Sequence, residues 1–387
     1  MSAVEILQDL EVGSQLCHRV GHLQLVAGRQ PGICELRSTL DKLKHVPQGS
    51  HRSEVRIELK GLKMTYTRRD LGKLAIAALP ATRVLAQSAP PGKPNSYWGG
   101  VQVGINVPYS YGNNNLSADE TINNTVQLGL SAVELRTQPI ESFLGSPAAG
   151  KTPPPTGRGR APLTPEQKAA QDALAADLKK WRLSLTADQF KKARKKFEDA
   201  GIAIQIMKVD TINNMDDQVV DYCFNLAKAL GAHAISCEIP LSRTKWLGAF
   251  ADKHKMMVGY HGHTNVTDPE AFGKPESWET AMTYAKYNGI NLDLGHFVAA
   301  NNVSPAEFLK KHHDRVTHIH VKDRKMNNGP NVPFGQGDTP IKEILQLMQK
   351  EKWKFQATIE FEYPIPEGSN RMAEIAKCVA YVKGCLT

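Results

Sequence analysis

Histidine and carboxylate residues recur in this sequence directly after short apolar segments that have the character of buried strands. Three pairs are spaced two residues apart: His261 and His263, His318 and His320, and Glu360 and Glu362. Side chains at positions i and i+2 of a strand lie on the same face of a sheet, so each pair can point to one site. Carboxylates and imidazoles together suit Mn²⁺, Fe²⁺, Co²⁺ or Zn²⁺. The pattern therefore predicts a site for one divalent metal ion.

Other polar residues end the neighbouring strand-like segments. They are Glu134, Asp210, Glu238, Asp293 and His296. The strands of a parallel barrel are buried on both faces, so a charged residue at a strand end needs a partner, and a metal ion is an effective one. A single histidine of this kind is more often a structural residue, but recurrence at consecutive strand ends favours a common site.

The elements that would position these residues alternate between strand and helix patterns over residues 98–387. Strands are predicted at 101–107, 132–137, 202–209, 232–239, 256–261, 290–294, 316–321 and 355–360. Helices are predicted at 119–128, 185–200, 216–230, 244–255, 277–287, 305–312, 340–350 and 371–382. Such alternation predicts an α/β protein with a single (β/α)₈ TIM barrel, whose active site lies at the carboxyl ends of the strands. An open doubly wound sheet is the alternative, but no dinucleotide-binding glycine motif follows the first strand.

One connection, residues 145–186, is long enough to count as an insertion. Its first part contains Pro153–Pro155 and a Gly-Arg-Gly-Arg segment, which disfavour regular structure, whereas residues 164–181 have a helical pattern. A connection of this length is typical of a lid or of a disordered insertion. It leaves the carboxyl end of the second strand, which is the active-site end of such a barrel.

The net charge of +9 is unevenly distributed along the chain. Residues 64–97 carry +4 and residues 145–186 carry +4, while the rest of residues 98–387 is close to neutral. A DNA-binding surface would leave a basic excess on the folded body, so no nucleic-acid partner is expected. No apolar run reaches the roughly 18 residues of a membrane-spanning helix, so no membrane anchoring is expected either. The six cysteines contain no C-x-x-C pair, which excludes a zinc ribbon.

Residues 64–97 resemble a Tat export signal followed by a linker. The twin arginine Arg68-Arg69 precedes an apolar run at 74–81, a small residue and a Pro/Ser-rich stretch. The resemblance predicts a periplasmic or extracellular protein; an amphipathic helix beginning at Thr67 is the alternative. Signals of this kind start near the N-terminus, so translation from Met64 rather than Met1 would explain the position. Residues 1–63 are then an extension that forms no folded domain, and the barrel is preceded only by a signal and a disordered region.

Three motifs carry a resemblance to a known family. They are D-x-x-H at 293–296, H-x-H-x-K-D at 318–323 and I-E at 359–360. Over residues 98–387 the chain resembles the xylose isomerase-like barrel superfamily, which includes sugar phosphate isomerases and epimerases. The resemblance implies that Asp293, His320 and Glu360 are metal ligands, that His296 contacts a small-molecule sugar substrate, and that Lys322 borders the site.

The chain departs from these relatives at the end of the fifth strand. The epimerases carry a metal-binding glutamate there, which also helps to abstract the proton, whereas this sequence has His261. Either His261 replaces that glutamate as the fourth ligand, or Glu238 reaches in from the fourth strand. If His261 binds the metal, Glu238 is the first candidate for the general base and His263 is the second.

The chemistry that follows is proton abstraction next to a carbonyl group. A metal-dependent sugar isomerase or epimerase is the preferred function, and export favours an unphosphorylated sugar or keto-sugar. A dehydratase, lyase or keto-glycoside-cleaving enzyme of the same barrel family is the alternative. A non-catalytic sugar-binding protein would need no stoichiometric metal. Cleavage of DNA by an endonuclease IV-like enzyme is disfavoured because it needs more histidines and a DNA-binding face.

Overall fold

The computed structural model describes residues 54–59, 62–67, 92–150 and 163–387. The chain divides into two units, Met1–Pro90 and Pro91–Thr387. In the first unit, β1 (Glu54–Leu59) pairs antiparallel with β2 (Leu62–Thr67), a hairpin that the sequence did not lead us to expect. The twin arginine and apolar run of the predicted export signal lie outside the described residues. Among the helices described, none has both the length and the apolar character to cross a membrane.

The second unit is a closed barrel of parallel strands, as predicted. The strands are β4 (Val101–Val107), β5 (Ala132–Arg136), β6 (Ala203–Lys208), β7 (Ala234–Cys237), β8 (Met257–His261), β9 (Asn288–Asp293), β10 (Val316–Val321) and β11 (Gln356–Ile359). They lie in sequence order, and β11 pairs with β4 to close the ring. A short strand β3 (Tyr97–Trp98) adds to β4 in the antiparallel direction. The fold is therefore a TIM barrel.

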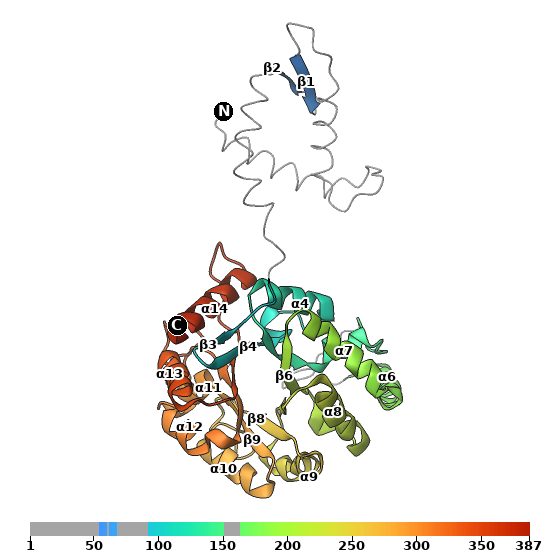
Figure 1. Ribbon diagram of the computed structural model, residues 1–387. Coiled ribbons are helices and arrows are strands. Elements are labelled where there is room, and N and C mark those ends of the chain that lie inside the picture. Colours follow the sequence, from blue (N-terminus) through green and yellow to red (C-terminus); the bar gives the residue numbers. More distant parts are fainter. Residues whose placement is uncertain (1–53, 60–61, 68–91, 151–162) are drawn as a thin grey trace. The chain divides into compact units, whose positions relative to one another are not determined.

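Helices surround the barrel on its outside (Figure 1). They are α4 (Ala118–Gln127), α7 (Ala187–Asp199), α8 (Asp217–Leu230), α9 (Thr244–His254), α10 (Pro275–Tyr284), α12 (Ala306–His312), α13 (Ile341–Glu351) and α14 (Arg371–Leu386). Each matches a helix predicted from the sequence to within a few residues. Their ends follow local rules: Ser117, for example, begins α4 in a capping box with Glu120.

Two further helices were missed because each begins directly after the last residue of a strand. Helix α5 (Thr137–Phe143) follows β5 without a loop, and α11 (Leu294–Asn301) follows β9 in the same way. The side chain of Asp293 ends β9 and caps α11, since its Oδ1 accepts a hydrogen bond from the backbone N–H of His296 at 2.7 Å. The D-x-x-H spacing is thus the spacing of a helix cap, which fixes both side chains at one end of the barrel.

The predicted helix of the insertion is present as α6 (Pro165–Ser184). It packs in the outer layer next to α8 (Figure 1), where Lys179 pairs with Asp216 at 3.0 Å. Arg182 donates two hydrogen bonds, of 2.8 and 2.9 Å, to the buried carboxylate of Glu141 in α5. The carboxyl half of α6 is therefore attached to the barrel. The proline-rich residues 151–162 lie outside the described part.

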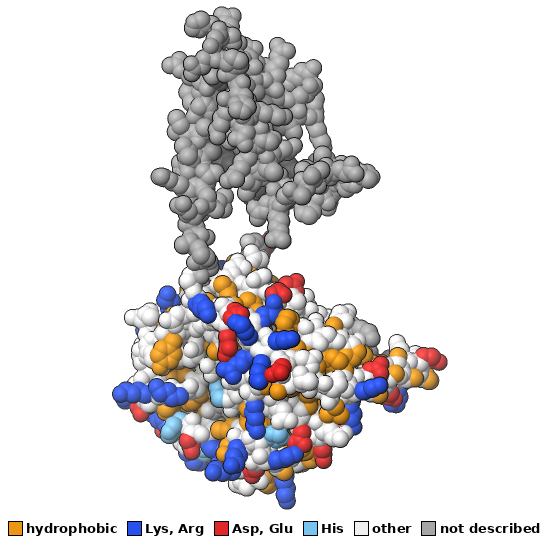
Figure 2. All heavy atoms as spheres, turned by 45° about the vertical axis from the view of Figure 1, so that its right-hand side comes forward, with side chains coloured by type: hydrophobic (Ala, Val, Ile, Leu, Met, Phe, Trp, Pro, Cys, Tyr) orange, Lys and Arg blue, Asp and Glu red, His pale blue; other side chains and the backbone are white. Residues whose placement is uncertain are grey.

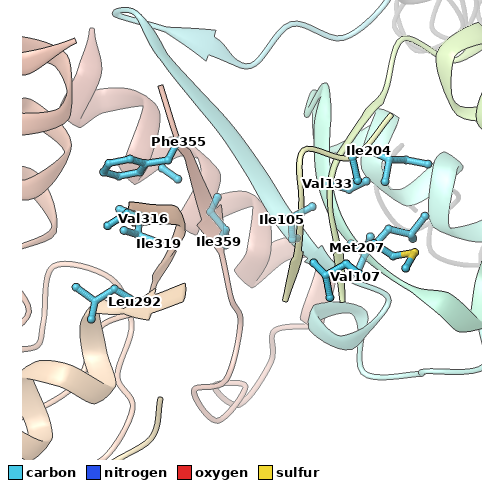
Figure 3. Packing of buried hydrophobic residues seen from close by; sticks show 14 of the residues in the cluster. Ile105, Val107, Val133, Ile204, Met207, Leu292, Val316, Ile319, Phe355 and Ile359 are labelled. Carbon is cyan, nitrogen blue, oxygen red and sulfur yellow. The ribbon is translucent and has the colours of Figure 1, made fainter. Parts of the chain in front are cut away.

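The barrel strands separate apolar from polar side chains with a period of two residues. Ile105, Val133, Ile319 and Ile359 belong to the buried hydrophobic core, where they pack from several strands (Figure 3). Each such side chain contributes roughly 1.5–3 kcal/mol to folding. The alternate positions, among them Glu134 and His320, face the other side and are also buried. On the outer surface, acidic and basic side chains are interspersed on the face shown in Figure 2.

Candidate metal centre and its surroundings

Four side chains from consecutive strands converge at the carboxyl end of the barrel. His261 ends β8, Asp293 ends β9, His320 lies in β10, and Glu360 follows β11. One ligand atom from each lies within 4.8 Å of the others, and all four residues are buried. The period of two explains the convergence, since each of these residues takes the inward position of its strand.

Each of these side chains turns one buried ligand atom toward the common point. The atoms are His261 Nδ1, Asp293 Oδ2, His320 Nδ1 and Glu360 Oε2; the two carboxylate oxygens pair with Lys322, whereas His261 Nδ1 has no hydrogen-bond partner among the described residues. His320 Nδ1 lies 3.2 Å from Glu360 Oε2 and 3.8 Å from Asp293 Oδ2. A buried polar atom without a partner costs about 1–3 kcal/mol, so the unpartnered Nδ1 of His261 beside these carboxylate oxygens indicates a missing ligand.

The second polar atom of three of these residues is held by the protein. Asp293 Oδ1 caps α11, and Glu360 Oε1 accepts a hydrogen bond of 2.8 Å from the side-chain amide of Asn106. His320 Nε2 lies 2.6 Å from Glu134 Oε2. Each of the three side chains is therefore oriented from outside and turns its other ligand atom toward the common point. Two carboxylates and two imidazoles in this arrangement fit one divalent metal ion.

Glu134 in β5 has a role that the sequence analysis did not assign. Its carboxylate lies between two imidazoles, 3.3 Å from His318 Nε2 and 2.6 Å from His320 Nε2. Burial opposes its ionisation, but the two imidazoles outweigh burial and hold the pKa of Glu134 well below its usual range. A carboxylate that accepts the N–H of a ligating histidine fixes the tautomer and orientation of the ring. The available signal was a glutamate in the middle of an otherwise apolar strand.

Lys322 lies among the carboxylates of the site. Its Nζ is 2.9 Å from Asp293 Oδ2, 2.7 Å from Glu360 Oε2 and 2.6 Å from Glu362 Oε2. Burial disfavours the charged amine, but the three carboxylates outweigh burial and raise the pKa of Lys322 above its usual value. The lysine is thus a cation next to the common point, which agrees with its predicted place at the edge of the site.

His296 in α11 borders the same space. Its Nδ1 lies 2.7 Å from the Arg324 guanidinium, and its Nε2 lies 3.1 Å from Lys322 Nζ. Burial lowers the pKa of His296 to about 4, so the ring is neutral near pH 7. Both ring nitrogens therefore face cationic side chains, Nδ1 the Arg324 guanidinium and Nε2 the Lys322 ammonium.

Glu238 is close to the four converging residues but is not one of them. Its Oε1 accepts a hydrogen bond of 2.7 Å from Lys208, and its Oε2 lies 3.2 Å from His263 Nε2. Burial opposes ionisation, yet Lys208 outweighs it and holds the pKa of Glu238 below its usual value. The ring centroids of His263 and His261 are 4.8 Å apart. Glu238 therefore forms an ionised group beside the candidate metal centre.

Asp323 organises the loop that contains the sequence Gly335-Gln-Gly-Asp338. Its carboxylate accepts backbone hydrogen bonds from Gly335, Gly337 and Thr339 at 2.8, 2.9 and 3.2 Å. A Cβ atom at Gly337 would lie only 1.9 Å from Asp323 Oδ1, so the approach requires glycine. The loop is thereby fixed against the residue that follows Lys322.

Comparisons with known proteins agree with the barrel fold. Residues 173–383 match the model of a family described as xylose isomerase-like TIM barrel. No curated protein matches the chain. A xylose isomerase domain protein of Alicyclobacillus acidocaldarius is 13% identical with a TM-score of 0.51, covering 74% of this chain and 99% of that one.

Two further solved structures match with slightly lower TM-scores. A probable 3-DHS dehydratase of Bacillus anthracis is 13% identical with a TM-score of 0.49, covering 73% of this chain and 98% of that one. A xylose isomerase-like TIM barrel protein of Mycobacterium smegmatis, in complex with magnesium, is 14% identical with a TM-score of 0.47, covering 75% and 97%. The family match extends over more than half of the sequence. The chain therefore belongs to the xylose isomerase-like TIM barrel family.

Proposed function

We propose that this protein is a divalent-metal-dependent sugar isomerase or epimerase that abstracts a proton next to a carbonyl group. The observation that carries the proposal is the convergence of one ligand atom from each of His261, Asp293, His320 and Glu360, all within 4.8 Å of one another. These residues would hold Mn²⁺, Co²⁺, Fe²⁺ or Zn²⁺. A bound ion of this kind acts as a Lewis acid on a carbonyl oxygen.

The residues around the metal centre have the properties that such a reaction needs. Lys322 is a cationic donor that can bind substrate oxygens and stabilise negative charge on them, and His296 borders the same space. Glu134 keeps His320 in one tautomer. The donors and the ligands lie at the carboxyl ends of the strands, where substrates bind in barrels of this type.

We assign Glu238 as the general base and His263 as the residue that positions it or replaces it. Lys208 keeps Glu238 ionised, and an ionised carboxylate can take a proton from carbon. His261 belongs to the metal group in this proposal because its Nδ1 is unpartnered, whereas both oxygens of Glu238 have partners. Return of the proton to the neighbouring carbon gives an isomer, and return to the opposite face gives an epimer.

Proton exchange in D₂O tests the proposal. The metal-loaded protein is incubated with free aldoses, ketoses and 3-keto sugars, and deuterium is located by NMR. Incorporation at one carbon next to the carbonyl is expected, and the Glu238→Gln variant should incorporate much less. Absence of incorporation with every sugar, in protein that holds stoichiometric metal, would contradict the assignment.

A dehydratase or lyase is the second candidate, and one observation favours it. The fourth position of the metal group is His261, where the epimerases of the family carry a glutamate that serves as one of two bases. A site with one free carboxylate is sufficient for elimination, in which one base removes the proton and a β-oxygen leaves. The same experiment separates the two functions, since elimination releases water or an alcohol and leaves an unsaturated product.

We also propose that the protein is exported through the Tat-like signal at residues 64–97. If the protein folds and binds its metal before export, the metal ions available in the cytoplasm determine which ion it carries. Outside the cell, availability there would decide which ion is bound. Changing both Arg68 and Arg69 to lysine should retain the protein in the cytoplasm. Unchanged export of this double variant would contradict the proposal.

A further inference from the structure

Opposite the metal ligands, strands β5 and β6 carry a second set of polar residues at the barrel mouth. The set consists of Arg136 at the end of β5, Gln138 in α5 and Asp210 after β6, and we call it the distal subsite. Asp210 Oδ1 pairs with the Arg136 guanidinium, and Gln138 donates a hydrogen bond of 3.2 Å to Asp210 Oδ2. The three side chains therefore form one connected group.

The distal subsite contains an unsatisfied donor and an unsatisfied acceptor. Arg136 Nε and Gln138 Oε1 are buried and have no hydrogen-bond partner among the described residues. The Arg136 side chain is only 11% exposed, so water does not solvate it freely. A buried donor beside a buried acceptor indicates a group that both accepts and donates hydrogen bonds.

The subsite is continuous with the candidate metal centre. The Arg136 guanidinium lies over the Tyr109 ring, 4.8 Å from its centroid. The Tyr109 hydroxyl donates a hydrogen bond of 2.6 Å to Glu362, which in turn pairs with Lys322 at 2.6 Å. A molecule that reacts at the metal centre can therefore extend toward Arg136, Gln138 and Asp210.

Charge at the mouth distinguishes between the possible ligands. In the pairs Arg136–Asp210 and Lys208–Glu238, the carboxylate is the more exposed partner: 29% against 11%, and 48% against 2%. A ligand that approaches from solvent meets carboxylate oxygens before it meets the cations. A phosphate group would be repelled, and since it only accepts hydrogen bonds at full ionisation, it would leave Gln138 Oε1 without a donor.

We propose that the distal subsite binds hydroxyl groups of an uncharged sugar and discriminates against its phosphate ester. A hydroxyl accepts from Arg136 Nε and donates to Gln138 Oε1, which satisfies both unpartnered atoms. This inference rests on the proposed function for the statement that a sugar reacts at the metal centre, and it adds the residues that select the free sugar.

The test measures binding to the Mn²⁺-loaded protein by calorimetry, for free aldoses, ketoses and 3-keto sugars and for their 6-phosphates. The wild type should bind a free sugar more tightly than its phosphate. Asp210→Asn removes the carboxylate charge. The affinity for the free sugar should fall, relative to the affinity for its phosphate, by roughly 10- to 100-fold, which corresponds to one hydrogen bond to a charged group. Gln138→Met removes the amide, both its acceptor Oε1 and its hydrogen bond to Asp210, but leaves the Asp210 charge in place; it should weaken binding of the free sugar without strengthening binding of the phosphate.

Asp221→Asn is the matched control. Asp221 lies in the middle of α8, where it pairs with Lys253 of the neighbouring helix α9, and it does not belong to the loops that form the barrel mouth. The inference is overturned if the wild type binds the phosphates more tightly, if it binds no free sugar, or if both variants keep the wild-type ratio while remaining folded. Tight binding and deuterium exchange of a phosphate ester would refute the subsite but support the isomerase. Binding of a free sugar without exchange would support the subsite but refute the isomerase.

Discussion

The two halves of the barrel mouth use charge in different ways. In the half formed by β8–β11, four residues bring one ligand atom each to a common point, and Lys322 pairs with two of them. In the half formed by β5–β7, Arg136 pairs with Asp210 and Lys208 pairs with Glu238. The first arrangement has more carboxylates than cations around Lys322 and fits a further cation, whereas each pair of the second is neutral. In the proposed function the metal half holds the ion, and the paired half supplies the general base and binds the substrate.

The largest effect is expected from the metal half. Asp293→Asn, Glu360→Gln, His320→Ala and His261→Ala each remove one ligand atom from the common point. Each should therefore lose metal affinity by more than the roughly 10–100-fold that follows loss of a group behind a ligand. Elemental analysis after dialysis measures the occupancy, with Glu279→Gln on the protein surface as a control. Full occupancy in the ligand variants would place the metal elsewhere.

The base in the paired half should affect the rate and spare the metal. Glu238→Gln preserves the hydrogen-bonding shape but cannot take a proton, so deuterium exchange should fall by roughly 10²–10⁴-fold, the range for one general base. Metal content should stay at the wild-type level. If Glu238→Gln loses the metal while His261→Ala keeps it, Glu238 is the fourth ligand and His261 is not.

Much of this comparison follows from the sequence. The succession of short apolar strand segments and helical patterns predicted the eight strands, and the period of two predicted that the pairs containing His261, His320 and Glu360 would each share one face. The contact of Glu134 with His320 could not be predicted, because it joins residues 186 positions apart and depends on barrel closure. The start of α11 was also missed, since Asp293 belongs to a strand and to a helix cap at once.

The choice between Glu238 and His261 as the fourth ligand also depends on contacts between strands that the sequence does not show. Glu238 and His261 end adjacent strands, and the sequence left both open as the fourth ligand. Lys208 occupies the inward position of β6 next to Glu238 and pairs with it, which accounts for one of its oxygens. A lysine inside a strand gives no indication in the sequence of the carboxylate that it will meet.

A smaller effect is expected from the carboxylate behind the metal half. Glu134→Gln retains a side chain that can contact His320 but removes the negative charge that fixes its tautomer. Metal affinity should fall by roughly 10–100-fold, with the fold retained. Competition with a chelator measures the affinity, and circular dichroism checks the fold. An unchanged affinity would show that Glu134 has only a structural role.

The smallest effect is a shift in pH dependence from the paired half. Lys208 holds the pKa of Glu238 below its usual value, and a base is active only when ionised, so exchange fails as the pH falls through that pKa. In Lys208→Met the pKa rises, and the acidic limb of the pH–rate profile should move upward by roughly 1–3 pH units. Lys253→Met, in a surface pair with Asp221, should leave the profile unchanged. An unchanged pH–rate profile in Lys208→Met would exclude Glu238 as the base.

The central claim is that one divalent ion binds between His261, Asp293, His320 and Glu360. A crystal structure of the Mn²⁺-loaded protein, with an anomalous difference map recorded near the manganese edge, tests it most directly. The account predicts one strong peak about 2.0–2.3 Å from His261 Nδ1, Asp293 Oδ2, His320 Nδ1 and Glu360 Oε2. A peak bound by Glu238 in place of His261, or no peak among these four residues at full Mn²⁺ loading, would contradict it.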